Sequence, residues 1–544
     1  MAPAPRRLVR WSFLLVLAAP GAAAPQAGTL VIAAPREAPT PIPTLFRNDN
    51  ANREVSDLLF LRLADLGPSL STTDEASFIP RLARRWIRRD PRTLVFELDP
   101  RARWHDGSPV TARDVVFTFA RARDTTLDRQ LAVLLRRIRS VTAEGDRRVA
   151  FTFTDAYPEQ LYDAVYHVPL LPAHLLEGLP PDSVSAGSFG RHPIGTGPYR
   201  WVRREPGQLI ALAADPDFFL GRPGIGRVIF LFASDPEARV NLVLAGQADA
   251  LDNAYNYPNP ERLLRAPALQ SFPGPSLTLG YLTFNQRDPA DTARPHPILS
   301  NPAVRRALIQ SLDRERIARS VYGNHTVLTD VPISQVVARN IRPPRPRPFD
   351  PAEARRLLGG QGWRDSDGDG VLDHQGTPLA LTLIVPATSA PRRAMAQQVQ
   401  EQWRAFGIRL EVQTLEPAAY VSRRRAGQFD LEFWSVTQDP TPSGLVQSWS
   451  CAGIGGSNVA HYCNPALDSL IARATEGRGD PGRLWPEALR ILADDAPALF
   501  LYAPESVPLV HRRFQGVVLR PDSPWSEVWR WRVRPGAELP RDRE

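Results

Sequence analysis

Segments with strand patterns alternate with segments with helix patterns along most of this chain. Apolar runs at residues 29–34, 228–232 and 379–385 have the length and composition of buried strands. Apolar residues at helical spacing follow two of these runs, at 235–244 and 394–406. This β–α–β rhythm predicts mixed α/β lobes. With 544 residues the chain is too long for one core, so we expect two or three lobes.

The region around Thr111 shows a well-marked helix start between two alternating strands. The strands are expected at 94–98 and 148–153. Thr111 is placed as the N-cap, and Asp114 three residues later supplies an acid that favours a helix N-terminus. The preceding His-Asp-Gly at 105–107 is predicted to form a turn, so its histidine is interpreted as structural rather than catalytic or metal-binding.

The first 24 residues have the three parts of a secretory signal peptide. Arg6, Arg7 and Arg10 precede the apolar run 11–19, and small residues that satisfy an A-x-A cleavage rule end at Ala24. The apolar run is too short to span a bilayer comfortably. No cysteine lies near the cleavage site to carry a lipid anchor, and no later stretch has the pattern of a transmembrane helix. We therefore expect an exported, periplasmic protein.

The basic residues are spread along the whole chain. All 66 are arginines, and with 58 acidic residues they give a formal net charge of +8, to which the signal segment contributes three arginines. Because acids are interspersed among the arginines, we interpret the charge as a solvated surface and expect no nucleic-acid partner. The 43% hydrophobic and 23% charged content is typical of a soluble globular protein.

The chain has two cysteines, Cys451 and Cys463, close together in the sequence. In an oxidising compartment such a pair is a disulfide candidate, and closing so short a loop contributes roughly 3 kcal/mol in the chain-entropy model. A pair of free buried thiols is the alternative. A metal site built on the cysteines is poorly supported, because His461 is the single potential partner ligand nearby.

Several motifs resemble those of family 5 extracellular solute-binding proteins, the peptide- and nickel-type binding components of ABC importers. The clearest are Arg-Trp-His-Asp-Gly-Ser-Pro-Val-Thr at 103–111 and Gly-Thr-Gly-Pro-Tyr at 195–199. The other matching segments are 80–86, 93–98, 112–117, 215–219, 244–249, 281–285, 304–308 and 462–468. Together they cover nearly all of the mature chain in the family's order.

The resemblance implies an α/β fold of the periplasmic-binding-protein type (type II, cluster C-like), with two lobes around a ligand cleft and an extra subdomain. The expected division is a signal peptide at 1–24, lobe I at 25–70, 190–275 and 500–535, the extra subdomain at 71–189, lobe II at 276–499, and a C-terminal tail at 536–544. It further implies a non-enzymatic monomer that delivers a small polar ligand, peptide or peptide-like, to the membrane subunits of an ABC importer by cleft closure.

The resemblance also points to the segment 429–440 for ligand contact. In peptide-binding relatives this segment reads G-W-x-x-D-x-x-D-P, and its first Asp receives the α-amino group of the peptide. Trp434 and Asp439 match, but the stretch between them is about one residue shorter, and Val436 or Thr437 falls at the amine-binding position. Because a buried ammonium needs a paired carboxylate, either Asp439 takes over this role or the ligand has no free amine there. We favour the second interpretation.

Four more residues are weaker ligand-binding candidates. Tyr281 and Asn285 lie on a segment that the resemblance places at a lobe crossing, and strand alternation puts them on one face with Thr283. Asn458 and His461 lie between the two cysteines. The alternatives are core packing for the tryptophan of the preceding segment, a turn for its aspartate, and a solvent-facing surface for the crossing strand.

A short Asp/Gly-rich loop resembles the first half of a calcium-binding loop. Asp365, Asp367 and Asp369 occupy positions 1, 3 and 5, and Asp373 occupies position 9. Gly376 stands at position 12, where a bidentate Glu is required, so the ligand set is incomplete. We expect no cofactor, with calcium as the alternative.

Three other functions remain as alternatives. A carrier of nickel chelates or another non-peptide solute belongs to the same family, but the nine histidines form no dense cluster in the sequence. A secreted hydrolase is disfavoured because the G-x-S-x-G, H-E-x-x-H and P-loop patterns are absent. A sensory or chaperone role would use the same fold with a receptor or an unfolded client as partner.

Overall fold

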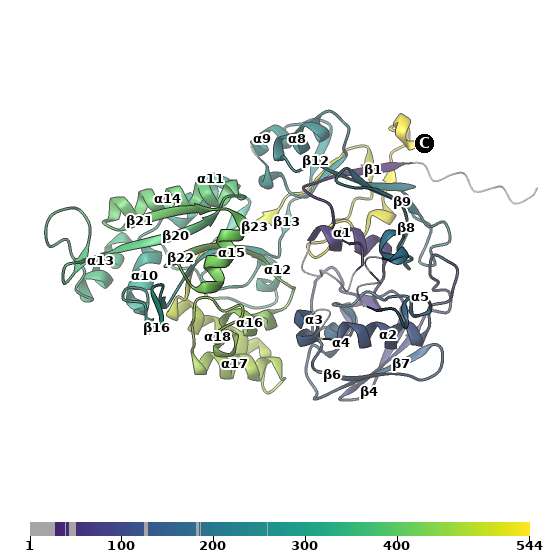
Figure 1. Ribbon diagram of the computed structural model, residues 1–544, viewed down its shortest axis with the longest axis horizontal. Coiled ribbons are helices and arrows are strands. Elements are labelled where there is room, and N and C mark those ends of the chain that lie inside the picture. The colour runs from purple at the N-terminus through teal and green to yellow at the C-terminus, as the bar shows by residue number, and fades with distance from the viewer. Residues whose placement is uncertain are drawn as a thin grey trace, which may run out of the picture.

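The computed structural model describes residues 28–38, 40–42, 50–124, 129–180, 184, 187–257 and 259–543. The predicted signal peptide and its cleavage site lie outside these residues. Within the described part of the chain, no helix has the length and apolar character needed to cross a membrane. Three main sheets organise the molecule into two lobes and a subdomain, and the two lobes lie side by side in Figure 1.

Lobe I is built on a seven-stranded sheet with the order β12-β24-β11-β1-β10-β9-β8. Its strands are β1 (Thr29–Ala34), β8 (Tyr199–Glu205), β9 (Leu209–Ala214), β10 (Arg227–Phe232), β11 (Ala250–Leu251), β12 (Leu269–Ser271) and β24 (Leu509–His511). The central strand β1 is fully buried and runs parallel to β10 and β11. Helices α8 (Pro236–Leu244) and α9 (Pro260–Leu264) belong to this lobe. The predicted strands 29–34 and 228–232 and the helix at 235–244 are confirmed.

The subdomain has an antiparallel sheet with the order β4-β5-β7-β6. Its elements are β4 (Ala83–Asp90), β5 (Thr93–Leu98), β6 (Ile138–Ala143), β7 (Arg148–Phe153), α2 (Ala112–Ala122), α3 (Arg129–Leu134), α4 (Gln160–Val165) and α5 (Ala173–Leu176). The predicted helix start is confirmed, because the Thr111 backbone N–H donates to Asp114 Oδ2 at 2.8 Å. The other Asp114 oxygen accepts from the Ala173 N–H at 2.9 Å, so one acid ties α2 to α5.

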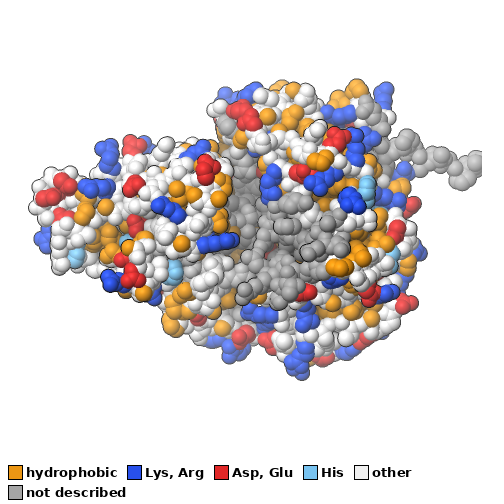
Figure 2. All heavy atoms as spheres, viewed as in Figure 1, with side chains coloured by type: hydrophobic (Ala, Val, Ile, Leu, Met, Phe, Trp, Pro, Cys, Tyr) orange, Lys and Arg blue, Asp and Glu red, His pale blue; other side chains and the backbone are white. Residues whose placement is uncertain are grey.

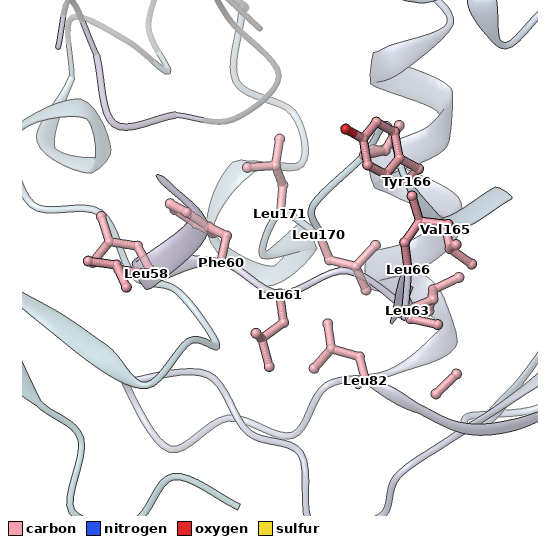
Figure 3. Packing of buried hydrophobic residues seen from close by; sticks show 14 of the residues in the cluster. Leu58, Phe60, Leu61, Leu63, Leu66, Leu82, Val165, Tyr166, Leu170 and Leu171 are labelled. Carbon is pink, nitrogen blue, oxygen red and sulfur yellow. The ribbon is translucent and has the colours of Figure 1, made fainter. Parts of the chain in front are cut away.

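A continuous apolar core joins the subdomain to lobe I. It begins at the end of α1 (Asn50–Leu59), where Leu58 and Phe60 lie in the same cluster as Leu170 and Leu171 (Figure 3). The Leu170 N–H donates to the carbonyl of Leu61 at 3.0 Å, which ties the two chain segments together within this core. The subdomain is therefore a packed extension of lobe I rather than a separate unit.

The Gly-Thr-Gly-Pro-Tyr element packs against the end of α1. A Cβ atom on Gly195 would lie 1.8 Å from the Leu59 carbonyl oxygen, and one on Gly197 would lie 2.3 Å from the Leu58 carbonyl oxygen. The buried His105 completes the contact, because its Nδ1 accepts from the Gly195 N–H at 3.1 Å and its Nε2 donates to the Gly197 carbonyl at 3.0 Å. Burial lowers the pKa of His105, which favours the neutral ring that this pairing needs. The histidine is structural, as expected.

Lobe II has a sheet with the order β13-β23-β14-β22-β20-β21, and β17 pairs with β23. Its strands are β13 (Gly274–Pro275), β14 (Thr278–Phe284), β17 (Thr326–Val327), β20 (Ala380–Pro386), β21 (Arg409–Leu415), β22 (Leu431–Thr437) and β23 (Ala498–Ser506). Helices α10 (Pro302–Gln310), α11 (Arg314–Tyr322), α13 (Pro351–Gly360) and α14 (Ala390–Phe406) pack in one core, and α16 (Leu445–Trp449), α17 (Pro465–Thr475) and α18 (Pro481–Asp495) in another.

Short elements complete the described chain. They are β2 (Ala64–Asp65), β3 (Ile79–Pro80), α7 (Ser188–Arg191), β15 (Arg287–Asp288), β16 (Asp291–Pro295), α12 (Gln335–Ala338), β18 (Asp373–His374), β19 (Thr377–Pro378), α15 (Pro417–Ala426), β25 (Phe514–Gln515) and β26 (Arg532–Val533). On the face shown in Figure 2, basic and acidic side chains are interspersed, which agrees with a solvated surface.

Two antiparallel chain segments connect the lobes. The first runs from β12 in lobe I to β13 in lobe II, and the second returns from β23 to β24. They are joined by a hydrogen bond from the Phe272 N–H to the Pro508 carbonyl at 2.9 Å and by the pairing of Gly274 with Ser506. The crossing therefore precedes Tyr281, which lies inside lobe II, and the chain leaves the second sheet after Ser506 rather than at residue 499.

Candidate ligand cleft

A cavity of about 690 Å³ lies between the two lobes. Loops at the carboxyl ends of parallel strands form much of it, because residues 252–257 follow β11 and residues 388–394 follow β20. Ligands of α/β sheets bind outside the carboxyl ends of strands, and sites for small molecules have volumes of roughly 300–1,000 Å³. Both the position and the volume of this cavity are those of a binding site for a small solute.

The lobe I side of the cavity (the lobe I wall) carries acidic and aromatic side chains. Its described residues are Arg53, Glu54, Pro236, Asp252, Asn253, Tyr255, Asn256, Tyr257, Pro260, Pro521, Ser523 and Pro524. Asp252 is held in place because the Tyr257 hydroxyl donates to its Oδ1 at 2.8 Å and the Asn256 amide donates to its Oδ2 at 2.9 Å. Burial and the neighbouring Asp252 raise the pKa of Glu54 to about 8, and Arg53 opposes this shift.

The lobe II side (the lobe II wall) carries hydroxyl groups and one cation. Its described residues are Ser276, Leu277, Thr278, Val321, Tyr322, Thr388, Ser389, Ala390, Pro391, Arg392, Ala394, Ser435, Thr437, Tyr502, Pro504 and Ser506. Arg392 lies in the first turn of α14 and donates to the Phe433 carbonyl at 3.3 Å. Tyr502 lies across β14 at Gly280, where a Cβ atom would come within 2.0 Å of the tyrosine ring. None of the described residues in this wall is acidic.

The lobes also touch at the edge away from the connecting strands, where α16 lies opposite α3 and α4 (Figure 1). Glu159, at the start of α4, accepts hydrogen bonds at 2.5 Å from the hydroxyls of Thr441 and Ser443 in lobe II. Burial opposes the charge of Arg53, but nearby acidic groups, Tyr166 first and Asp439 of lobe II among them, raise its pKa. These contacts bridge the cleft, so the structure is a closed form.

Asp439 thus interacts electrostatically with lobe I and does not belong to the cavity wall. Trp434 does not belong to it either. Ser435 and Thr437 face the cavity, and strand alternation turns Trp434 to the opposite face of β22. There the Arg424 guanidinium lies 4.0 Å from the centre of the Trp434 ring, which also packs in the apolar core. Core packing, the alternative interpretation of this tryptophan, describes its surroundings.

The other four predicted contact residues also lie outside the described wall. Tyr281 packs between Trp449 and Phe500, with ring centres 5.7 and 5.4 Å away. Asn285 is fully buried and donates from its amide to the carbonyls of residues 427 and 429. His461 Nδ1 donates to Asn285 Oδ1 at 3.2 Å.

Asn458 has a similar structural role. Its amide donates to the backbone carbonyls of residues 450 and 462 at 2.8 and 2.7 Å. Strand alternation correctly placed Tyr281 and Thr283 on one face of β14. That face packs on α16–α18 and the side chain of Glu432 rather than on the cavity.

Cys451 and Cys463 form a disulfide with an S–S distance of 1.99 Å. In the Asp/Gly-rich loop, carboxylate oxygens of Asp365, Asp367 and Asp369 lie within 4.8 Å of one another on an exposed surface. The Asp373 carboxylate instead accepts hydrogen bonds from the backbone N–H and hydroxyl of residue 366, at 2.8 and 2.7 Å. Calcium therefore remains a hypothesis that rests on three exposed carboxylates.

Sequence reasoning did not select Glu54, Asp252, Arg392 or Tyr502. A usable signal existed for two of them. Asp252 directly follows a strand, and Arg392 lies in the helix start after a strand, which are the positions where α/β sheets bind ligands. For Glu54 there was no such signal, because its place at the cavity depends on how α1 packs between the lobes.

Comparison with known proteins gives one consistent family. The model for bacterial extracellular solute-binding proteins, family 5 (middle part), matches residues 77–456. The oligopeptide-binding protein AppA of Bacillus subtilis is 25% identical over 93% of this chain and 92% of its own length. The structure of that AppA in complex with a nonapeptide has a TM-score of 0.76 at 24% identity, covering 94% of this chain and all of AppA. NikA of Brucella suis in complex with Fe(III)-EDTA has a TM-score of 0.80 at 18% identity, covering 93% of this chain and all of NikA.

Proposed function

This chain belongs to family 5 of the bacterial extracellular solute-binding proteins, and on that premise we propose that it carries a short peptide or peptide-like solute to an ABC importer. The solute binds in the cavity between the two lobes. The observation that carries this proposal is the cavity of about 690 Å³ between the lobes, with polar groups on both walls. The peptide-binding names of the relatives, such as that of AppA, support the choice of ligand class.

Binding and closure are coupled in this proposal. A ligand shifts the open–closed equilibrium only by the difference between its affinities for the two forms. A solute that contacts both walls binds the closed form more tightly, because the two lobes come together around the connecting strands. The membrane subunits of the importer then recognise the closed, loaded protein.

The place of action follows from the family. Its members are extracellular or periplasmic, and we propose that the N-terminal signal segment exports this chain to the periplasm. Binding without turnover is the second part of the proposal. The family itself supports it, because its members are solute-binding proteins.

A thermal-shift panel on the mature protein tests the function. The panel contains alanine peptides of two to five residues, a nickel–histidine complex and sugars. A ligand at 100 times its dissociation constant stabilises the protein by about 2.7 kcal/mol, which raises the melting temperature measurably. We expect the peptides to raise it. A shift with the nickel complex or sugars alone would contradict the peptide assignment.

A cavity-filling variant tests whether the rise in melting temperature comes from peptide binding in the cavity. Thr437→Trp places a large ring in the lobe II wall and should abolish the peptide response. Thr414→Trp is the matched control, because Thr414 is an exposed threonine on β21 of the same sheet, outside the cavity wall. Equal responses of the two variants would show that peptide binds elsewhere.

A further inference from the structure

The two walls of the cavity differ in charge. The lobe I wall presents two carboxylates, Glu54 on α1 and Asp252 after β11, whereas the lobe II wall presents Arg392. Arg53 also reaches the cavity, but its charge is shared with acidic groups outside the wall, Asp439 among them. Across the cavity, an acidic pair therefore stands on one lobe and a cation on the other.

The acidic pair is preorganised to receive a hydrogen-bond donor. Each oxygen of Asp252 accepts one hydrogen bond, from the hydroxyl of Tyr257 or the amide of Asn256. A carboxylate oxygen can accept two, so each keeps capacity for a ligand. The carboxylate is thus held in one orientation by two neutral side chains.

The two carboxylates also influence each other. The charged groups that face Glu54 are Arg53 and Asp57 on α1 and Asp252 from the adjacent loop. Burial first, and then Asp252, raise the pKa of Glu54 to about 8, although Arg53 opposes them. Arg53 offsets this shift only in part, so a cationic ligand group would further stabilise the charged form of the two carboxyl groups.

The lobe II segment at the family's amine-binding position cannot pair with an ammonium group. The residue facing the cavity there is Thr437, which is neutral, and the described lobe II wall has no acid. Asp439, the nearest acid along the chain, lies outside the wall and interacts with Arg53. The carboxylates that face the cavity come from lobe I.

We infer that Glu54 and Asp252 receive the ammonium group of the ligand on lobe I, while Arg392 of lobe II faces its carboxylate. This inference rests on the proposed function and names its ligand class, a solute with a free amine at one end and an anionic group at the other. It replaces the expectation that the ligand has no free amine. The amine is bound by the opposite lobe from the one that the family pattern indicates.

Binding is linked to a proton. Below pH 8 the carboxyl of Glu54 in the empty cavity holds a proton. An incoming ammonium group favours the carboxylate, so that proton leaves to solvent as the ligand binds. For a peptide whose amine stays protonated, affinity should rise on the order of tenfold between pH 6 and pH 7.

Isothermal titration calorimetry tests the inference with alanine peptides of two to five residues, each free and N-acetylated. For the wild type we expect free peptides to bind on the order of a hundredfold more tightly than acetylated ones. Glu54→Gln and Asp252→Asn should each weaken free-peptide binding by about tenfold or more and change acetylated-peptide binding by less than about twofold. Glu261→Gln on α9, an exposed acid of the same lobe, is the matched control and should change neither.

Proton release gives a second readout, and its wild-type value does not depend on any variant. Titrations at pH 6.5 in phosphate and in Tris should show release of close to one proton per free peptide for the wild type, and none for Glu54→Gln. Equal binding of free and acetylated peptides, or equal losses of both in the two variants, would overturn the inference and leave the proposed function intact. Failure of the wild type to bind any peptide would instead contradict the proposed function.

Discussion

The two walls of the cavity are built from different chemistry. On lobe I, Glu54 and Asp252 stand among tyrosines, whereas on lobe II hydroxyl groups surround Arg392 at the start of α14. Each wall alone offers a weak site, because one end of a solute would stay in water. A ligand with charges at both ends satisfies both walls only when the lobes are together. The difference between the walls therefore explains how one ligand can drive closure.

Reversing the charge of the lobe II wall should break this arrangement most strongly. Arg392→Glu makes both walls acidic, and we expect the affinity for free peptides to fall by about a hundredfold, close to 2.7 kcal/mol. Peptides amidated at the C-terminus should lose much less. Calorimetry on both peptide forms measures the difference, with circular dichroism to verify folding. Equal losses would show that Arg392 does not face the ligand carboxylate.

The raised pKa of Glu54 in the lobe I wall should make the stability of the ligand-free protein depend on pH. The folded pKa of Glu54 is raised to about 8 from its ordinary value of 4.5, so the folded state holds a proton that the unfolded chain releases in this window. Stability therefore falls as pH rises from 5 to 6.5, by about 2 kcal/mol relative to Glu54→Gln. Thermal melts of both proteins at the two pH values test this. Parallel curves would mean that Glu54 is not perturbed.

The hydrogen bonds of Glu159, at the edge away from the connecting strands, should contribute less to ligand affinity than either wall does. Glu159→Ala removes the acceptor for the hydroxyls of Thr441 and Ser443 and so weakens the closed form. We expect affinity for every ligand to fall by roughly fivefold, about 1 kcal/mol, with no change in the preference for a free amine. The ratio of free to acetylated peptide affinities is the measurement. A changed ratio would place Glu159 in amine recognition.

Calcium should have the smallest effect. Three exposed carboxylates lack the bidentate ligand that completes such a loop, and Asp373 is engaged with Ser366. We expect added calcium to change the melting temperature by less than about 1 °C. A larger increase that is lost in Asp367→Asn would establish a calcium site here.

Much of the fold follows from local sequence signals. The strand 29–34 and the helix that begins after Thr111 are encoded by apolar runs and by a capping acid, which act over a few residues. The close approach of Gly195 and Gly197 to the end of α1 gives a physical reason for that motif. These features depend on neighbours in sequence or on a single packing contact.

The ligand site depends instead on which face of a strand meets the cavity. Alternation along β22 separates Trp434 from Ser435 and Thr437, but it does not say which set faces the other lobe. That choice is made by the distant helices α16–α18, which cover the Trp434 face. In the same way, Glu54 and Asp252 lie nearly two hundred residues apart in sequence, and only the packing of α1 against the lobe I loops brings them to one wall.

Photo-crosslinking would locate the bound solute most directly. A free tripeptide carrying a benzophenone side chain is bound to the wild type, irradiated, and its attachment sites are read by mass spectrometry with and without excess alanine peptide. We predict competable attachment to wall residues from both lobes, at 252–257 and at 388–394 or 435–437. Attachment around Asn458 and His461, or none that the alanine peptide competes, would contradict binding between the two lobes.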